Sequence, residues 1–163
     1  LWLGVNLFTA ILASSVIYLF QETIDEVVYL AVLMPIVANM GGVAGTQTLT
    51  LVIRSMALGH ISASNSRWLL LRELGVAAIN GIIWASLISI IAFIWYQDLK
   101  ISYIIAGAMM INLITAALAG AYLPIFLKRI AIDPALAGSV VLTTVTDSIG
   151  FLAFLGLAQI FYV

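Results

Sequence analysis

The chain has 163 residues, of which 64% are hydrophobic and 8% are charged, with a mean hydropathy of +1.23. Soluble domains are about 45–50% apolar and about 25% charged, and a chain this short cannot bury so much apolar surface in its own core. The composition therefore excludes a soluble enzyme or a disordered tail and predicts an all-α integral membrane protein in contact with lipid. A net charge of −1 leaves no polybasic surface, so a nucleic-acid-binding protein is excluded as well. Without cysteine, and with His60 as the single histidine, zinc sites built from those ligands are excluded.

Five apolar stretches are long enough to cross a bilayer, which takes about 20 residues of helix. They cover residues 1–20, 27–58, 69–95, 101–127 and 135–162. The runs are continuous, so they predict helices and not the alternating strands of a β-barrel. The second stretch would form about 48 Å of helix, so it must tilt, extend beyond the membrane or break, and Pro35 or the pair Gly41–Gly42 would be the place for a kink.

The chain begins at Leu1 directly in apolar sequence, so we expect a fragment whose upstream part is missing. We expect residues 1–163 to form one transmembrane domain. We also expect a short interfacial helix over residues 62–68, before the third span.

Basic residues are distributed unequally among the links between these spans. Five of the six lie in or beside the second and fourth links: Arg54, Arg67, Arg72, Lys128 and Arg129. Lys100 alone lies in the third link, and the first link is acidic. The positive-inside rule therefore predicts a cytoplasmic N-terminus and an extracytoplasmic C-terminus in a multi-pass cell-membrane protein.

Asp147 is the single ionisable residue near the middle of a predicted span. An aspartate at a helix centre costs about 2.5–3.5 kcal/mol on insertion, so a cation, a water-filled cavity or a basic partner must offset that cost. No Lys or Arg is predicted at the same depth. Ser139, Thr143, Thr144 and Gly150 form a narrow polar stripe with Asp147. The alternatives are a protonated, hydrogen-bonded Asp147 and threonines that bond to their own helix.

A second polar cluster lies in the second span. Small residues at four-residue spacing, Gly41 with Gly45 and Ala38 with Gly42, predict close helix packing. Packing alone does not require the polar side chains of the same segment, which are Asn39, Thr46, Gln47 and Thr48. Glycines also expose carbonyl oxygens, and a hard cation or its hydration shell binds oxygen, so the cluster also indicates a cation site.

The third and fourth spans contain further seams of small residues, which we interpret as packing surfaces. They are Ala77, Gly81, Ala85 and Ser89 in the third span, and Ala116, Ala117, Gly120 and Ala121 in the fourth. Asn80 and Asn112 are expected to form hydrogen bonds between helices. Glu73, at the cytoplasmic entrance of the third span, is either a cation acceptor or an interfacial charge paired with Arg72. We favour the pair, because charges at membrane ends are inexpensive.

The polar segments resemble a known family, the MgtE-type magnesium channels. Residues 35–50, PIVANMGGVAGTQTLT, followed by Arg54 and ALGHI at 57–61, are similar to the second transmembrane helix of that family. The TTVTD motif at 143–147, with DPA at 133–135 before it and GF at 150–151 and FLG at 154–156 after it, is similar to the fifth helix. The resemblance covers essentially the whole chain, and the TTVTD motif is its most specific part.

The resemblance implies a homodimer with a pore on the two-fold axis, lined mainly by the second and fifth helices. It implies that Asp147 binds hydrated Mg²⁺, the transported ion, and that cytosolic CBS-type regulatory domains precede the first helix in the full-length protein. We expect the metal site to include Asp147, Thr143, Thr144, Gly41, Gly42 and Gly45. We expect the pore lining to include Asn39, Ala38, Thr46, Ser139 and Gly150.

One position departs from the family pattern. Val43 follows Gly41–Gly42, where the family often has asparagine. Either Asn39, one helical turn earlier, takes over the polar role, or the pore differs in detail.

The expected function is conduction of hydrated Mg²⁺ down its electrochemical gradient, without catalysis. One alternative is a proton-coupled divalent cation carrier, in which Asp147 alternates between protonated and cation-bound forms. Another is a membrane scaffold that does not transport. An intramembrane aspartyl enzyme would need a second carboxylate nearby, which a single chain lacks at that depth although a dimer could bring two copies together.

Overall fold

The computed structural model describes residues 2–61 and 66–162, which form six α-helices. The helices are α1 (Trp2–Leu19), α2 (Gln21–Glu26), α3 (Tyr29–Ala57), α4 (Ser66–Tyr96), α5 (Leu99–Arg129) and α6 (Pro134–Tyr162). All except α2 are long and apolar enough to cross a membrane, which confirms the all-helical fold with five spans. The short helix α2 lies in the first link and was not predicted. Most of the interfacial helix expected over 62–68 falls outside the described residues, and 66–68 begin α4.

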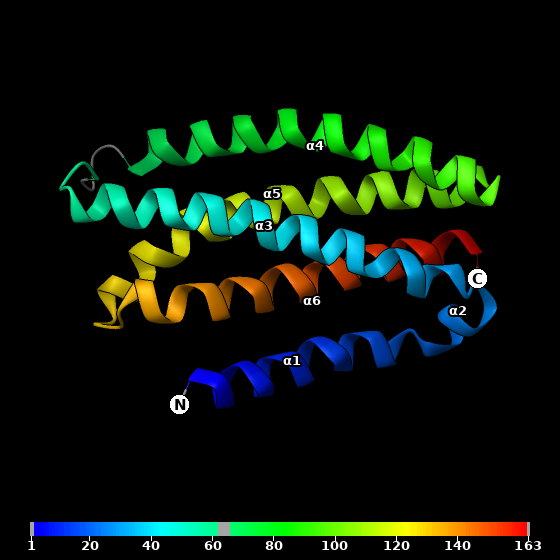
Figure 1. The fold of residues 1–163 in the computed structure, drawn as a ribbon, viewed down its shortest axis with the longest axis horizontal. Coiled ribbons are helices and arrows are strands. Elements are labelled where there is room, and N and C mark those ends of the chain that lie inside the picture. Colours follow the sequence, from blue (N-terminus) through cyan, green and yellow to red (C-terminus); the bar gives the residue numbers. More distant parts are fainter. Residues whose placement is uncertain (1, 62–65, 163) are drawn as a thin grey trace.

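The long helices run up and down beside one another, so the links gather at the two ends of the bundle (Figure 1). The α3–α4 and α5–α6 connections lie at one end. Helix α2, the α4–α5 connection and the C-terminus lie at the other end. The links that carry most of the basic residues therefore share one end, as the orientation predicted from the positive-inside rule requires.

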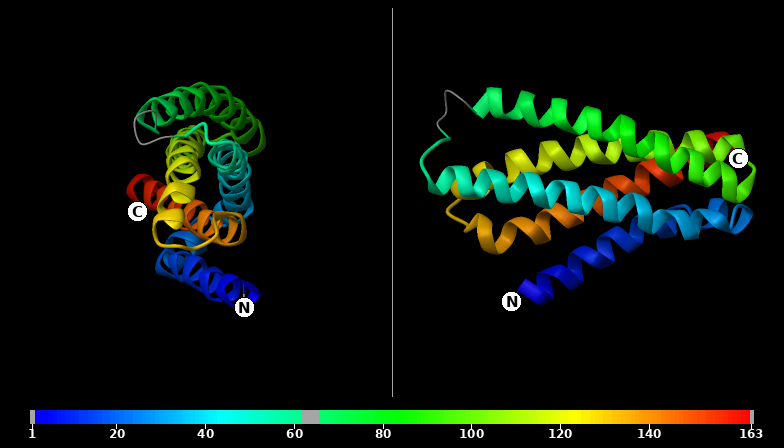
Figure 2. Two further views of the ribbon diagram at one scale, coloured as in Figure 1. Left: turned by 90° about the vertical axis from the view of Figure 1, so that its left-hand side faces the viewer. Right: turned by 45° about the horizontal axis from the view of Figure 1, so that its top comes forward.

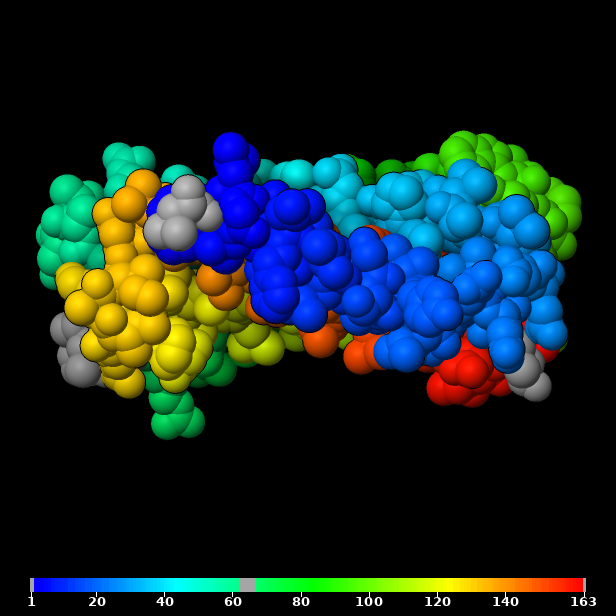
Figure 3. Space-filling model, turned by 90° about the horizontal axis from the view of Figure 1, so that it is seen from below, coloured from blue at the N-terminus to red at the C-terminus, as the bar shows by residue number. Residues whose placement is uncertain are grey.

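The helices form successive layers when the bundle is viewed along its length (Figure 2). Helix α4 lies on one side of α3 and α5, α6 lies on the other side, and α1 is outermost beyond α6. Helix α5 packs against α3, α4 and α6, whereas α4 makes few direct contacts with α3. Helix α1 runs across one face of the molecule, with atoms of α3 and α6 visible beside it (Figure 3).

Small residues allow the central helices to approach closely. A Cβ atom built on Gly120 of α5 would lie 2.6 Å from the carbonyl oxygen of Gly45 in α3. A Cβ atom built on Gly81 of α4 would lie 2.5 Å from Sδ of Met110 in α5. These contacts confirm that the seams of small residues in the third and fourth spans are packing surfaces.

Helix α3 is continuous over its 29 residues and contains Pro35. At 1.5 Å per residue it is about 44 Å long, which exceeds the hydrocarbon thickness of about 30 Å. Because the helix is continuous, it has no break at the glycine pair. A kink at Pro35 or at Gly41–Gly42, tilt, and extension beyond the lipid stay predictions.

Candidate functional site

A groove of about 370 Å³ lies between α3 and α6. Helix α3 supplies one wall, with Ala38, Asn39, Gly42, Val43, Thr46 and Gln47. Helix α6 supplies the other wall, with Thr143 and Asp147. The fold therefore brings together side chains from the two segments that the sequence singled out.

Asp147 is the charged group of this groove and is half-buried in its wall. Within the described residues, its carboxylate has no hydrogen-bond donor and no basic partner. The alternative of an aspartate hydrogen-bonded within a helix interface therefore finds no protein partner here. Both carboxylate oxygens are available to whatever occupies the groove.

The threonine hydroxyls of the groove donate to their own helices. Thr143 donates to the carbonyl oxygens of Ser139 at 3.0 Å and Val140 at 3.1 Å, and Thr46 donates to Gly42 at 2.7 Å. These bonds confirm the alternative raised for the threonines. Because the hydroxyl protons are used in this way, the oxygens keep lone pairs that can accept hydrogen bonds. Such a wall suits the hydration shell of a cation, whose waters donate outward.

Some predicted site residues lie away from the groove. Five of them are not among the residues that line it: Thr144, Ser139, Gly41, Gly45 and Gly150. Thr144 donates to the carbonyl oxygen of Val140 at 2.7 Å. A Cβ atom on Gly45 would lie 2.9 Å from Cδ1 of Leu142 in α6. Any ion contact made by these residues, through backbone carbonyls or across a dimer axis, stays a prediction.

Asn112 of α5 fixes the spacing of the two groove walls from behind. It is fully buried, and its Nδ2 donates to the carbonyl oxygen of Val37 in α3 at 2.8 Å. Cβ atoms built on Gly41 and Gly150 would both clash with that same Nδ2, the second at 2.8 Å. The predicted interhelical hydrogen bond is confirmed. The close contacts of Asn112 with Gly41 of α3 and Gly150 of α6 were not predicted.

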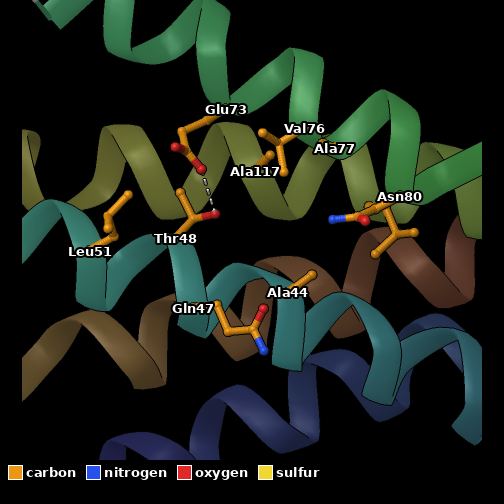
Figure 4. Close-up of a pocket in the computed structure, with 10 residues that line it drawn as sticks. Ala44, Gln47, Thr48, Leu51, Glu73, Val76, Ala77, Asn80 and Ala117 are labelled. Carbon is orange, nitrogen blue, oxygen red and sulfur yellow. Dashed lines mark hydrogen bonds between the residues drawn. The ribbon is translucent and has the colours of Figure 1, made fainter.

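Glu73 lies in a different cavity, of about 240 Å³, between α3, α4 and α5 (Figure 4). The residue is 7% exposed and accepts a hydrogen bond from the hydroxyl of Thr48 at 3.2 Å. The favoured pair with Arg72 is not formed in the described residues. The guanidinium of Arg72 lies instead 5.8 Å from the centre of the Trp68 ring. The physical reason is that adjacent residues of a helix point in different directions.

At the opposite end of the bundle, Asp98 joins three helices. Its Oδ1 accepts the backbone N–H of Lys100 at 2.8 Å, and its Oδ2 accepts from the Tyr29 hydroxyl at 2.8 Å and from the Tyr162 hydroxyl. Burial pushes the pKa of Asp98 up, but the hydrogen bonds from Tyr162, Tyr29 and Lys100 outweigh it and lower the pKa below its ordinary value. No spacing along the chain indicates this cluster, because its members come from three separate segments.

Within residues 2–61 and 66–162, no group of three or more His, Asp or Glu side chains could hold a metal ion. The groove therefore offers one carboxylate and a set of neutral oxygens.

The fold and the groove together define a multi-pass membrane protein with an acidic site inside its helical bundle. The family MgtE, described as a divalent cation transporter, matches residues 34–157. The chain therefore belongs to the MgtE family of divalent cation transporters.

Three curated relatives match 98% of the chain over 160 residues, and each is named magnesium transporter MgtE. The protein of Bacillus subtilis is 31% identical and is covered over 36% of its length. The proteins of Enterococcus faecalis and Thermus thermophilus are 29% and 28% identical, each covered over 35%. The chain thus spans about a third of the length of these relatives.

Proposed function

We propose that residues 1–163 form the Mg²⁺-conducting membrane domain of a transporter and that Asp147 is the centre of its selectivity. The observation that carries the proposal is the groove between α3 and α6, where Asp147 has no protein partner in the described residues. The relatives are magnesium transporters by name, which supports Mg²⁺ as the ion. Their greater length supports further cytosolic domains, expected to be of the CBS type, in the full-length protein.

The ion moves with its water shell. Mg²⁺ dehydrates reluctantly and prefers six oxygen ligands. Six waters at about 30 Å³ each need about 180 Å³, which the groove of about 370 Å³ accommodates. The Asp147 carboxylate attracts the dication, while Thr143, Thr46 and Asn39 accept hydrogen bonds from its waters. Backbone carbonyls of residues 41–45 serve as further acceptors.

The pore is completed by a second copy of the chain. One copy supplies a single carboxylate, and two related by a two-fold axis supply two, enough to balance the charge of one dication. Val43 lines the groove and is 49% exposed, so a Val43→Cys variant should cross-link between copies. Ile79→Cys, on an exposed part of α4, is the matched control and should not. Monomers alone with Val43→Cys, or a trimer, would contradict the dimer.

The basic end of the bundle faces the cytoplasm in this proposal. Single cysteines at Glu22 and Gln97 should react with an impermeant reagent from outside intact cells, and one at Arg129 should not. All three positions are exposed in the structure, so accessibility does not bias the comparison. If only Arg129→Cys were labelled from outside, the orientation would be the opposite of the one proposed.

Transport is tested with the full-length protein in liposomes. A membrane potential of 100 mV drives a dication with about 4.6 kcal/mol, twice the value for one charge. We expect Mg²⁺ influx that rises with the potential and needs no proton gradient. Flux that vanishes without a proton gradient would replace the channel with a proton-coupled carrier. The absence of any flux would instead support a membrane scaffold that does not transport.

A further inference from the structure

The cavity around Glu73 is separate from the Asp147 groove but adjoins it along α3. It lies where α3 and α4 make few direct contacts, above their common neighbour α5. Glu73 and Thr48 point toward one another across this space (Figure 4). Glu73, Ala77 and Asn80 follow at helical spacing on the α4 side.

Thr48 behaves differently from the other threonines of α3. Thr46 and Thr50 donate to the carbonyl oxygens four residues before them, at 2.7 Å and 2.8 Å. The hydroxyl of Thr48 donates instead to the carboxylate of Glu73. Thr48 therefore directs its hydroxyl into the cavity, toward Glu73, and not to its own helix.

A carboxyl group that is 7% exposed inside a membrane bundle is costly to bury unless other groups in the bundle or a bound ion interact with it. No basic side chain of the described residues pairs with Glu73. The cavity is also lined by the hydroxyl of Thr48 and the amide groups of Asn80 and Gln47, each of which has an oxygen atom that can bind a cation or its water. Carboxylate, carbonyl and water oxygens are the ligands that Mg²⁺ and Mn²⁺ prefer. The volume of about 240 Å³ exceeds the roughly 180 Å³ that six waters need.

Gln47 connects the two cavities, because it lines both the Asp147 groove and the Glu73 cavity. Helices α4 and α6 start at the same end of the bundle. Glu73 lies about 10 Å along α4 from that end, and Asp147 lies about 20 Å along α6. The Glu73 cavity is therefore closer to the end that carries most of the basic residues.

We propose that the Glu73 cavity is a second cation site, which holds a hydrated divalent cation beside the Asp147 groove. The inference rests on the proposed transport function, because the cation it holds is the transported one. Glu73 supplies the charge, Thr48 and Asn80 bind the ion or its waters, and Gln47 lies between the two sites.

The test counts bound Mn²⁺ by electron paramagnetic resonance on the full-length protein in detergent. Parent protein is compared with Glu73→Gln, which keeps the shape and loses the charge, and with Asp147→Asn. We expect Glu73→Gln to bind one Mn²⁺ fewer per chain and Asp147→Asn to retain that ion. Glu22→Gln, the same change at an exposed acid, is the matched control and should bind as many ions as the parent.

A second variant keeps the test decisive if Glu73→Gln does not fold. Thr48→Val removes one oxygen at nearly constant volume and should weaken binding of that Mn²⁺ by about tenfold or more. An unchanged Mn²⁺ count in folded Glu73→Gln, or an unchanged affinity in Thr48→Val, would overturn the second site.

Flux through the parent protein in liposomes separates this inference from the proposed function. Mg²⁺ flux with an unchanged Mn²⁺ count in Glu73→Gln would overturn the second site alone. Absent flux would overturn the proposed function, and the Mn²⁺ count would still decide whether Glu73 binds a cation.

Discussion

Replacing Gly120 with alanine should force α3 and α5 apart. The new Cβ would lie 2.6 Å from the Gly45 carbonyl oxygen, 2.9 Å from Cβ of Thr48 and 3.2 Å from the backbone nitrogen of Leu49. An ordinary contact begins at 3.4 Å, so the backbones must separate by about 0.8 Å (3.4 minus 2.6). A gap of that size loses about a quarter to a half of the dispersion energy of the affected contacts.

The expected cost is about 1–3 kcal/mol of the free energy of unfolding, the usual range for an overpacked core. Alanine also gains helix propensity over glycine, by about 1 kcal/mol, and this gain must be removed from the comparison. Gly75→Ala in α4 is the matched control, because its Cβ would meet nothing within 4 Å. The difference between the two variants isolates the clash.

The assay is reversible unfolding of the full-length protein in mixed detergent micelles, followed for parent, Gly120→Ala and Gly75→Ala. Gly120→Ala should be about 1–3 kcal/mol less stable than Gly75→Ala. Equal stability of the two variants would refute the close approach of α3 and α5 at Gly120.

Two further predictions concern the packing behind the groove and the opposite end of the bundle. Gly41→Ala should destabilise the fold by about 1–3 kcal/mol, because its Cβ would clash with Nδ2 of Asn112. In a double-mutant cycle, adding Asn112→Ala should recover part of that loss. If the effects of the two changes simply add, the contact between them is contradicted. The pKa of Asp98 is lower in the folded protein than in the unfolded chain, where it is about 3.9, so the hydrogen bonds from Tyr29 and Tyr162 stabilise the fold at any pH above that value. This stabilisation is lost as the pH falls through the lower pKa of the folded protein. Asp98→Asn should therefore be less stable than the parent at neutral pH and should lose less stability on acidification, whereas parallel pH profiles would contradict the assignment.

The sequence predicted the spans well, because lipid-facing and core-facing positions are both apolar and leave long continuous runs. It did not predict α2, since Gln21–Glu26 is short, acidic and without an apolar period. Thr23 is nevertheless 2% exposed, because packing against the bundle, and not local pattern, orders this link.

The groove was predicted in part from the cost of burying a charge. That cost singled out Asp147, and helical spacing added Thr143. The rotation of α3 about its axis was not predictable, because glycines and polar residues lie on more than one face of it. Gly41 therefore faces α5, whereas Gly42, one residue further, lines the groove.

The burial of Glu73 could not be predicted for a related reason. Its place near the start of a span suggested an interface and a pair with its neighbour. The seam of Ala77 and Gly81 draws α4 onto α5, and this packing turns Glu73 inward toward Thr48. Only the relation between separate helices specifies that environment.

The most direct test of the central claim is Mg²⁺ influx into liposomes that contain the full-length protein with Asp147→Asn, measured at equal protein density beside the parent. This variant keeps the shape of the side chain and removes the charge. We expect influx through the parent, influx at the level of protein-free liposomes for Asp147→Asn, and influx at the parent's rate for Glu22→Gln. Influx through Asp147→Asn at the parent's rate would contradict the claim that the Asp147 carboxylate is the basis of Mg²⁺ conduction.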